Sequence, residues 1–247
     1  MKSKNKEEKK ILRDMCTRCG TCCMKGGPVL HNQDKKILVS GYVGYHHLVT
    51  IRKDELAFNP LKNRIEPSET ELIKIKGKGN DWSCYFYNVK ESSCIIYENR
   101  FLECRLLKCW DNSDLISIIG RDTLMRKDII NRDDPILSII ETHEKECPFN
   151  EINNLLYALP QEKNKSKLLV KLKDYVNKDI TIRSYALSEL GLKSEFEPFI
   201  FGRPLFKILS AYGISVHMSK DILRWYLPEP EDPLSGISEI KQKGRET

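Results

Sequence analysis

The sequence lacks the apolar segments that direct a chain to a membrane. No apolar run among its 247 residues approaches the roughly 18 residues that suggest a membrane span. The basic opening, residues 1–13, is not followed by an apolar stretch or a small-residue cleavage site, so it does not match a secretory signal. We therefore expect a cytoplasmic protein with no membrane partner.

The sequence also lacks a strong excess of charge of either sign. It carries 41 basic and 35 acidic residues, for a formal net charge of +6. Part of this excess lies in residues 1–13, which we interpret as a solvated basic arm. The mild bias disfavours a nucleic-acid partner and leaves an unknown protein partner open.

The short motifs of several enzyme classes are absent as well. The chain has no Gly-x-Gly-x-x-Gly, no phosphate-binding loop, no Gly-x-Ser-x-Gly and no His-Glu-x-x-His. Internal repeats are also missing, apart from recurring pairs of cysteines. The sequence therefore leaves it open whether the protein is an enzyme.

Cysteine is the residue type that the sequence does have in an unusual pattern. Eight of the nine cysteines lie in the first 109 residues. In a reducing compartment thiols stay free, so this number argues for metal or redox chemistry and against a disulfide framework. The odd count points the same way.

The first group of cysteines is a dense one, because four thiols fall within eight residues. They are Cys16, Cys19, Cys22 and Cys23. Thiolates are soft, strongly donating ligands, and two-residue gaps let one turn of backbone aim successive sulfurs at one centre. Adjacent side chains tend to diverge, however, so the Cys22–Cys23 pair suggests that one of the two faces a second centre.

The second group contains the later cysteines Cys84, Cys94, Cys104 and Cys109. A β-rich run at 82–87 and another at 94–97 predict a hairpin that brings Cys84 close to Cys94. Residues 98–109 are helix formers with Cys104 near the middle. Cys109 lies five residues later, so sharing a site with Cys104 requires the helix to break at 108–110.

The expected fold class is α+β. Short strand-like pieces are predicted at 29–30, 37–39 and 71–76, and a loop or short helix at 53–67. Helical spacing then covers 114–127, 134–146, 150–159, 165–178, 181–190 and 203–212. We therefore predict a cysteine-cluster domain over 1–112, a helical region over 113–228 and a flexible tail over 229–247.

Four further residues are weaker candidates for metal ligands. His46 and His47 are adjacent, and neighbouring side chains point apart in a helix or a strand, so solvated or core histidines are the favoured interpretation. Cys147 follows His143 by four residues, so the two share one helix face. Single buried cysteines are common core residues, and we expect Cys147 to lie outside the site.

The ordered set of cysteines resembles the YkgJ-type cysteine-cluster family, whose domain is described as chelating zinc or iron through a CxxCxxCC signature. The resemblance covers about residues 14–110 and includes Cys16-x-x-Cys19-Gly-x-Cys22-Cys23 and the later stretch from Cys94 through Tyr97, Arg100 and Cys104. Phe101 departs from it where many members have proline. The stretch 106–109 also departs, which leaves the role of Cys109 less defined.

The resulting hypothesis is a metal-binding protein that holds an iron–sulfur cluster or zinc through up to eight thiolates, with the cluster slightly favoured by their number. Some members of the resembled family are implicated in flagellin lysine methylation, so a metal-dependent modifying enzyme is one alternative. A zinc-stabilised interaction module is another. Arg105 and Lys108 have two equal interpretations, as charges that offset the thiolates or as plain surface residues, and Trp82 and Tyr97 are expected to exclude water.

Overall fold

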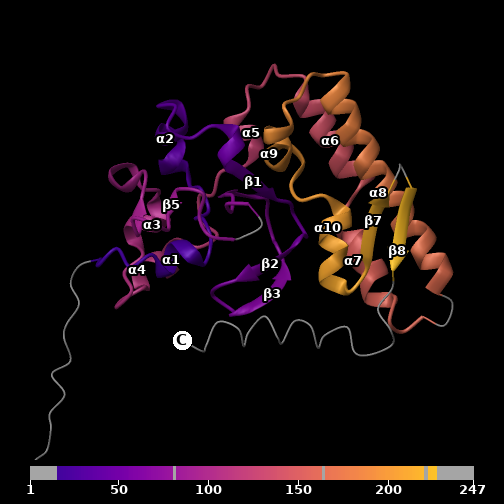
Figure 1. Ribbon diagram of the computed structural model, residues 1–247, viewed down its shortest axis with the longest axis horizontal. Helices are drawn as coiled ribbons and strands as arrows, with labels where there is room; N and C mark the ends of the chain where they lie inside the picture. The colour runs from indigo at the N-terminus through magenta and orange to yellow at the C-terminus, as the bar shows by residue number, and fades with distance from the viewer. Residues whose placement is uncertain (1–15, 80–81, 163–164, 220–221, 227–247) are drawn as a thin grey trace, which may run out of the picture.

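The computed structural model describes residues 16–79, 82–162, 165–219 and 222–226. The predicted basic arm and flexible tail lie outside these residues. The described part is a mixed α+β fold, with short strands in the N-terminal part and mainly helices in the C-terminal half, as expected. Figure 1 shows α1 (Thr21–Met24), α3 (Leu102–Leu106) and α4 (Ser113–Ile118) at one end of the molecule. At the other end are α6 (Ile136–Glu146), α7 (Phe149–Ala158), α8 (Lys165–Ser188) and α10 (Leu205–Ile208). None of the helices in these ranges is long and apolar enough to cross a membrane.

Two antiparallel strands form the centre of the N-terminal part. Strand β1 (Leu48–Ile51) pairs with β4 (Leu72–Ile75), with Leu48 opposite Ile75 and Ile51 opposite Leu72. All four residues of β1 are buried because α9 covers it. The prediction for 71–76 is therefore confirmed, and the piece at 29–30 forms an isolated bridge between Val29 and Lys74.

The prediction of a loop or short helix at 53–67 is wrong. This segment is a hairpin of β2 (Leu56–Asn59) and β3 (Arg64–Pro67). The Asn59 side-chain oxygen accepts hydrogen bonds from the backbone N–H groups of residues 61 and 62, which closes the turn. Asn63 takes a positive φ of 50°, which asparagine tolerates better than most residues.

The predicted strand at 37–39 is also wrong, because these residues end the helix α2 (Lys35–Val39), which follows η1 (Asn32–Asp34). Ile37 is buried, whereas Val39 is 81% exposed. Residues two apart share a face on a strand and lie nearly opposite on a helix, so this burial fits only the helix. The short 3-10 turn η2 (Tyr45–His47) then leads into β1.

The region of the second cysteine group is compact. The predicted hairpin is present as β5 (Tyr87–Asn88) and β6 (Ser93–Cys94), shorter than expected. After η3 (Tyr97–Asn99), the helix α3 (Leu102–Leu106) is capped at Leu107, and Lys108 forms a bridge with Asp111. The predicted break at 108–110 is thus confirmed, although the helix begins later than residue 98.

The single helix expected at 114–127 is instead two short ones, α4 (Ser113–Ile118) and α5 (Arg126–Ile129). Gly120 and Asp122 lie between them with positive φ angles of 74° and 49°. A helix cannot continue through such angles, so the chain turns there.

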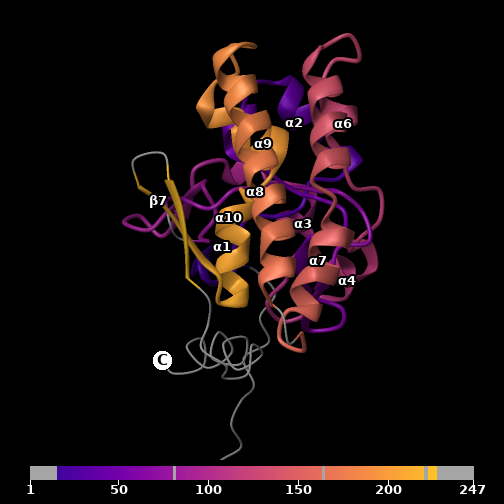
Figure 2. The same ribbon diagram turned by 90° about the vertical axis from the view of Figure 1, so that its right-hand side faces the viewer.

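The C-terminal half contains the long helices. They are α6 (Ile136–Glu146), α7 (Phe149–Ala158) and α8 (Lys165–Ser188), with α8 alongside the other two (Figure 2). The segments predicted separately at 165–178 and 181–190 are one helix. Asp134 accepts a hydrogen bond from the Ile136 N–H at the start of α6, and Gly191 and Gly213 have positive φ.

The chain ends, within the described residues, in several short elements. They are η4 (Ser194–Phe196), α9 (Glu197–Phe201), α10 (Leu205–Ile208), η5 (Leu209–Tyr212) and the hairpin of β7 (Ser215–Ser219) and β8 (Ile222–Tyr226). The helix predicted at 203–212 is therefore α10 followed by η5, and α9 and the last hairpin were not predicted.

Two apolar cores hold these elements together. The first combines the N-terminal strands with α6 and α9, and the second lies among α7, α8, α10 and β7. At the junction the Thr50 hydroxyl donates to the Phe199 carbonyl over 2.5 Å. A Cβ on Gly202, whose φ is +71°, would stand 2.8 Å from the Thr50 carbonyl oxygen. The first core thus includes residues from both sides of position 112, and a domain boundary there stays a prediction.

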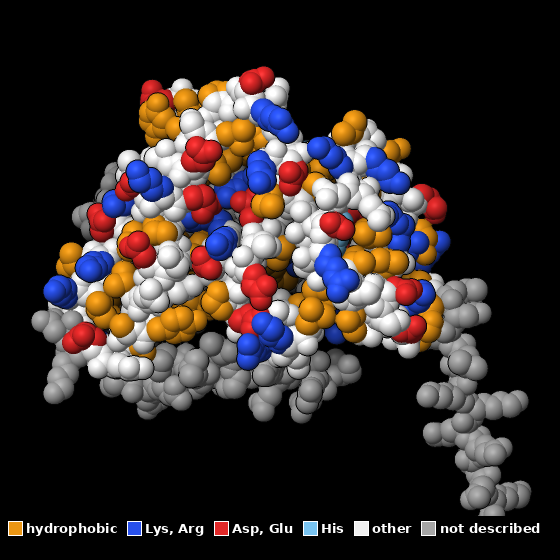
Figure 3. Space-filling model, turned by 180° about the vertical axis from the view of Figure 1, so that it is seen from behind, with side chains coloured by type: hydrophobic (Ala, Val, Ile, Leu, Met, Phe, Trp, Pro, Cys, Tyr) orange, Lys and Arg blue, Asp and Glu red, His pale blue; other side chains and the backbone are white. Residues whose placement is uncertain are grey.

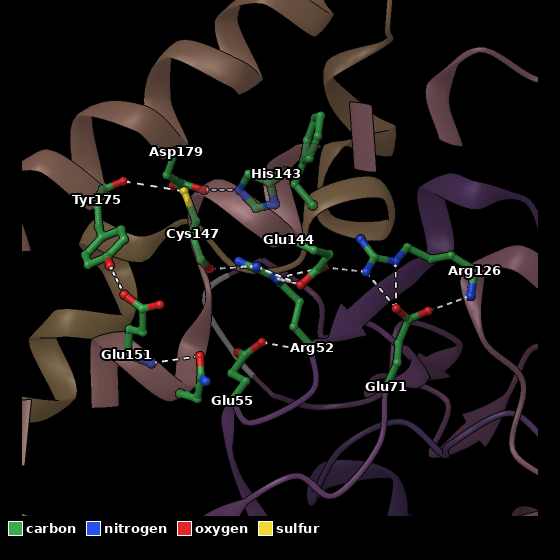
Figure 4. Close-up of polar contacts among 12 residues, drawn as sticks. Arg52, Glu55, Glu71, Arg126, His143, Glu144, Cys147, Glu151, Tyr175 and Asp179 are labelled. Atoms are coloured by element: carbon green, nitrogen blue, oxygen red, sulfur yellow. Dashed lines mark hydrogen bonds and ion pairs between the residues drawn. The ribbon is translucent and has the colours of Figure 1, made fainter. Parts of the chain in front are cut away.

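Buried ion pairs join the two halves of the chain (Figure 4). The fully buried Arg52 bonds Glu144 on α6 through Nε and Nη2, at 2.7–2.9 Å, and donates to the Cys147 carbonyl at 2.8 Å. Arg126 bridges Glu71 and Glu144 at 2.6 and 2.5 Å. These charges are satisfied only when both halves are in place, so they specify how the halves fit together.

The surface has a different character from this interior. On the face seen in Figure 3, basic and acidic side chains are interspersed with apolar ones. The described residues of that face therefore present mixed charge and no field of one sign.

Candidate metal centre

The predicted thiols are carried by four short segments. Helix α1 (Thr21–Met24) holds Cys22 and Cys23, Cys84 forms a bridge with Gly77, Cys94 ends β6 and Cys104 lies inside α3. The Cys84 N–H donates to the Cys23 carbonyl at 2.7 Å. The two sequence groups, about 60 residues apart, are therefore joined through their backbones.

Gly20 explains how α1 fits against the second group. Its φ of +76° starts the helix from a left-handed conformation, and the Met24 N–H donates to its carbonyl at 2.9 Å. A Cβ at this position would stand 1.9 Å from the Tyr87 hydroxyl oxygen. The glycine between the two cysteine pairs thus allows the close approach of α1 to β5.

The adjacent thiols of Cys22 and Cys23 do not diverge as expected, because they are hydrogen-bonded to each other. The hydrogen bond from Cys23 lowers the pKa of Cys22 to about 6, and nearby Arg100 also favours the thiolate. The same hydrogen bond, followed by burial, raises the pKa of Cys23. The pair therefore releases one proton readily and keeps the second.

Three more thiols complete what we call the inner thiols, Cys22, Cys23, Cys84, Cys94 and Cys104. Burial raises the pKa of each of the last three, and other inner thiols contribute to each shift. Mutual electrostatic influence of this kind requires proximity. The structure therefore brings five of the eight predicted ligands into one neighbourhood.

The other three predicted ligands, Cys16, Cys19 and Cys109, are exposed. The Cys19 sulfur lies 3.3 Å from the Thr21 hydroxyl, and that hydrogen bond lowers the pKa of Cys19. We call these three the outer thiols. Their part in a ligand set stays a prediction.

The inner thiols do not surround a common metal position in this structure. Across residues 16–79, 82–162, 165–219 and 222–226, no three His, Cys, Asp or Glu side chains form a group that could hold a metal ion as it stands. The chemistry of the donors suits zinc or iron, since both prefer thiolate ligands. Metal binding would thus require the thiols to move closer together.

Buried polar residues that the sequence analysis missed support this centre. Asp34, fully buried, accepts hydrogen bonds from the Leu102 N–H at 2.8 Å and the His31 N–H at 3.0 Å. Glu103 accepts from the Val29 N–H at 2.7 Å and lies 3.4 Å from the His31 ring. These contacts fix the start of α3 and hence Cys104. Nothing in the local sequence signals the contacts of Asp34 with Leu102 and of Glu103 with Val29, because these partners are 68 and 74 residues apart.

The basic residue whose charge acts on Cys22 is Arg100, and not Arg105 or Lys108. Arg105 donates to the Arg100 carbonyl, and Lys108 pairs with Asp114 at 2.6 Å. Arg100 instead contributes to lowering the pKa of Cys22. Trp82 is 56% exposed, so it does not shield the centre as expected, whereas Tyr97 is half-buried.

The weaker candidates lie apart from the inner thiols. His46 and His47 do not point apart, since their ring centroids are 3.7 Å from each other, and the His47 ring nitrogen accepts from the Gly44 N–H. His143 is bound to Asp179 at 2.6 Å. Cys147 is fully buried, and burial raises its pKa to about 12. The thiol of Cys147 is thus a core group.

Comparison with known families agrees with this geometry. Residues 15–127 match the family model described as "CxxCxxCC: Putative zinc- or iron-chelating domain". This part of the chain is therefore similar to a CxxCxxCC domain. The resemblance expected from the motif is confirmed, and the matched residues include all the inner and outer thiols. Searches of curated proteins and of solved structures gave no significant match.

Proposed function

We propose that the inner thiols hold an iron–sulfur cluster, with zinc as the alternative occupant. The observation that carries this proposal is that Cys23, Cys84, Cys94 and Cys104 pack into one apolar core, with Cys22 next to Cys23 on α1, although their segments are spread over residues 22–104. A zinc ion and a common iron–sulfur cluster are each closed by four thiolates, so the five inner thiols are enough for either, and the eight inner and outer thiols together would serve two such centres. The free state of all nine cysteines supports a cytoplasmic location.

The residues around the thiols prepare them for this role. Cys22 is a thiolate at neutral pH because its pKa lies near 6, so it can bind metal without first losing a proton. Asp34 and Glu103 hold α3 and so set the position of Cys104. When bound, a cluster would supply electron transfer or Lewis acidity.

A modifying enzyme has less support. The pocket formed by α2, η2, η4 and α5 has a volume of about 520 Å³ and is lined largely by apolar side chains. None of the inner or outer thiols lines it. A substrate bound there would therefore not meet the proposed centre.

The ligand assignment is tested by two serine variants of buried or half-buried cysteines. We expect Cys104→Ser to lower the metal content of the purified protein to less than half of the wild-type value. Cys147→Ser is the matched control, since it removes a buried thiol outside the inner set and should keep the metal. Equal losses in both variants would contradict the assignment.

A further inference from the structure

Two guanidinium groups lie over the aromatic ring of Tyr97. The Cζ atom of Arg18 lies 4.0 Å from the centroid of its ring, and that of Arg100 lies 3.8 Å from it. Both distances are well within the range of a cation–π interaction. We call these three residues the arginine clasp.

The clasp joins the two groups of cysteines. Arg18 lies between Cys16 and Cys19, whereas Tyr97 follows Cys94 by three residues. Arg100 belongs to the second side, because its Nε donates to the Tyr97 carbonyl at 2.9 Å. The contact of Arg18 with Tyr97 therefore links the CxxC loop to the segment between Cys94 and Cys104.

The backbone of Arg18 forms part of a tight turn in the CxxC loop. Its φ is +57°, in the left-handed region that a residue with a Cβ seldom adopts. The Arg18 N–H also donates to the Cys16 sulfur at 3.4 Å. An exposed arginine free of constraint would relax to a negative φ, so the ring contact helps to hold the loop in its turn.

The charges of the clasp point toward an anionic neighbour. Two guanidinium groups on one ring repel each other, which weakens the pair in isolation. Four thiolates around one divalent ion carry a net charge of about −2, and an anionic centre beside Arg18 and Arg100 would offset this repulsion. Simple surface packing of two arginines on a tyrosine does not explain why Arg18 is next to Cys19 in the sequence while the charge of Arg100 acts on Cys22.

We propose that the arginine clasp positions the CxxC loop against the second cysteine segment, so that the thiols of both groups close on one metal centre. This inference rests on the proposed function. Tyr97 and Arg18 act here as positioning residues, because the thiols alone would contact the metal. The clasp should tighten when metal binds, since the thiolates then gather negative charge beside the two arginines.

The test compares variants by competition with a chromophoric chelator for Zn²⁺, using the full chain. We expect Tyr97→Leu and Arg18→Gln each to bind zinc about tenfold more weakly. Tyr97→Phe keeps the ring and should bind like the wild type. Arg132→Gln removes an exposed arginine elsewhere and serves as the control.

Circular dichroism of the metal-free variants separates positioning from folding. Arg18 is exposed, so Arg18→Gln should leave the thermal midpoint of the metal-free protein unchanged while it weakens zinc binding. Zinc affinities of Arg18→Gln and Tyr97→Leu within twofold of wild type would overturn the clasp. Wild-type protein that binds neither zinc nor iron would instead overturn the proposed function itself.

Discussion

At the scale of single residues, Cys22 is the thiol that the structure makes most reactive. It is half-exposed, receives a hydrogen bond from the Cys23 thiol, and lies near the positive charge of Arg100. Both neighbours stabilise the thiolate. Cys104 is in the opposite situation, because burial and neighbouring cysteines favour its neutral thiol.

This contrast predicts the order of alkylation in the metal-free, reduced protein. The rate at which Cys22 reacts with iodoacetamide should rise with pH and reach half of its high-pH value near pH 6. Cys104 should react slowly throughout pH 5–8. Peptide mapping by mass spectrometry gives the rate for each site. A midpoint for Cys22 near pH 8.5, the value of an ordinary thiol, would contradict the prediction.

At the scale of elements, α3 depends on a partner far away in the sequence. Its five residues are too few for a stable isolated helix, so tertiary contacts must hold it. Asp34 provides one contact at its first turn, and the side chain of Glu103 provides another by bonding the Val29 N–H.

Replacing Asp34 with alanine should therefore destabilise the protein. The change leaves the buried N–H groups of His31 and Leu102 without partners, at a cost of about 2–4 kcal/mol in the free energy of unfolding. Urea denaturation measures this loss. The exposed Asp133→Ala serves as the control, and equal stabilities of the two variants would rule out a structural role for Asp34.

The elements also show which parts of the fold could be predicted from the sequence. The β-rich runs around Cys84 and Cys94 were enough to predict the hairpin, whereas the divided metal centre indicated by the cysteine spacing stays a prediction. The helix at 37–39 was missed because three apolar residues suit a strand equally well, and only tertiary burial separates Ile37 from Val39. Asp34 and Arg100 were missed because their partners come from tertiary contacts, which a local pattern does not record.

At the scale of the whole molecule, a buried polar cluster joins α6 to α8 in the C-terminal half. The His143 Nε2–H donates to the Asp179 carboxylate at 2.6 Å, and Asp179 also pairs with Arg183 at 2.8 Å. His143 is fully buried, and burial lowers its pKa to about 4, against 6.5 for an exposed imidazole.

A lowered histidine pKa makes stability depend on pH in a defined direction. The unfolded chain binds a proton at His143 below pH 6.5, and the folded chain binds it only below about pH 4. The stabilisation is therefore complete above pH 6.5 and is lost as the pH falls toward 4. Between pH 7 and pH 5 the loss from this residue is about 2 kcal/mol.

Urea unfolding at pH 7 and pH 5 measures this effect when wild type is compared with His143→Gln. The variant has no titrating group at this position, so its stability should fall by about 2 kcal/mol less than that of wild type over the same interval. Parallel losses in both proteins would show that His143 does not titrate in this way.

The most direct test of the proposed centre is the metal content of protein purified without oxygen, measured together with its absorption spectrum. We predict at least one iron or zinc atom per chain, with iron accompanied by a charge-transfer band that bleaches on reduction. Less than one metal atom per chain in fresh material, with all cysteines reduced, would contradict the account.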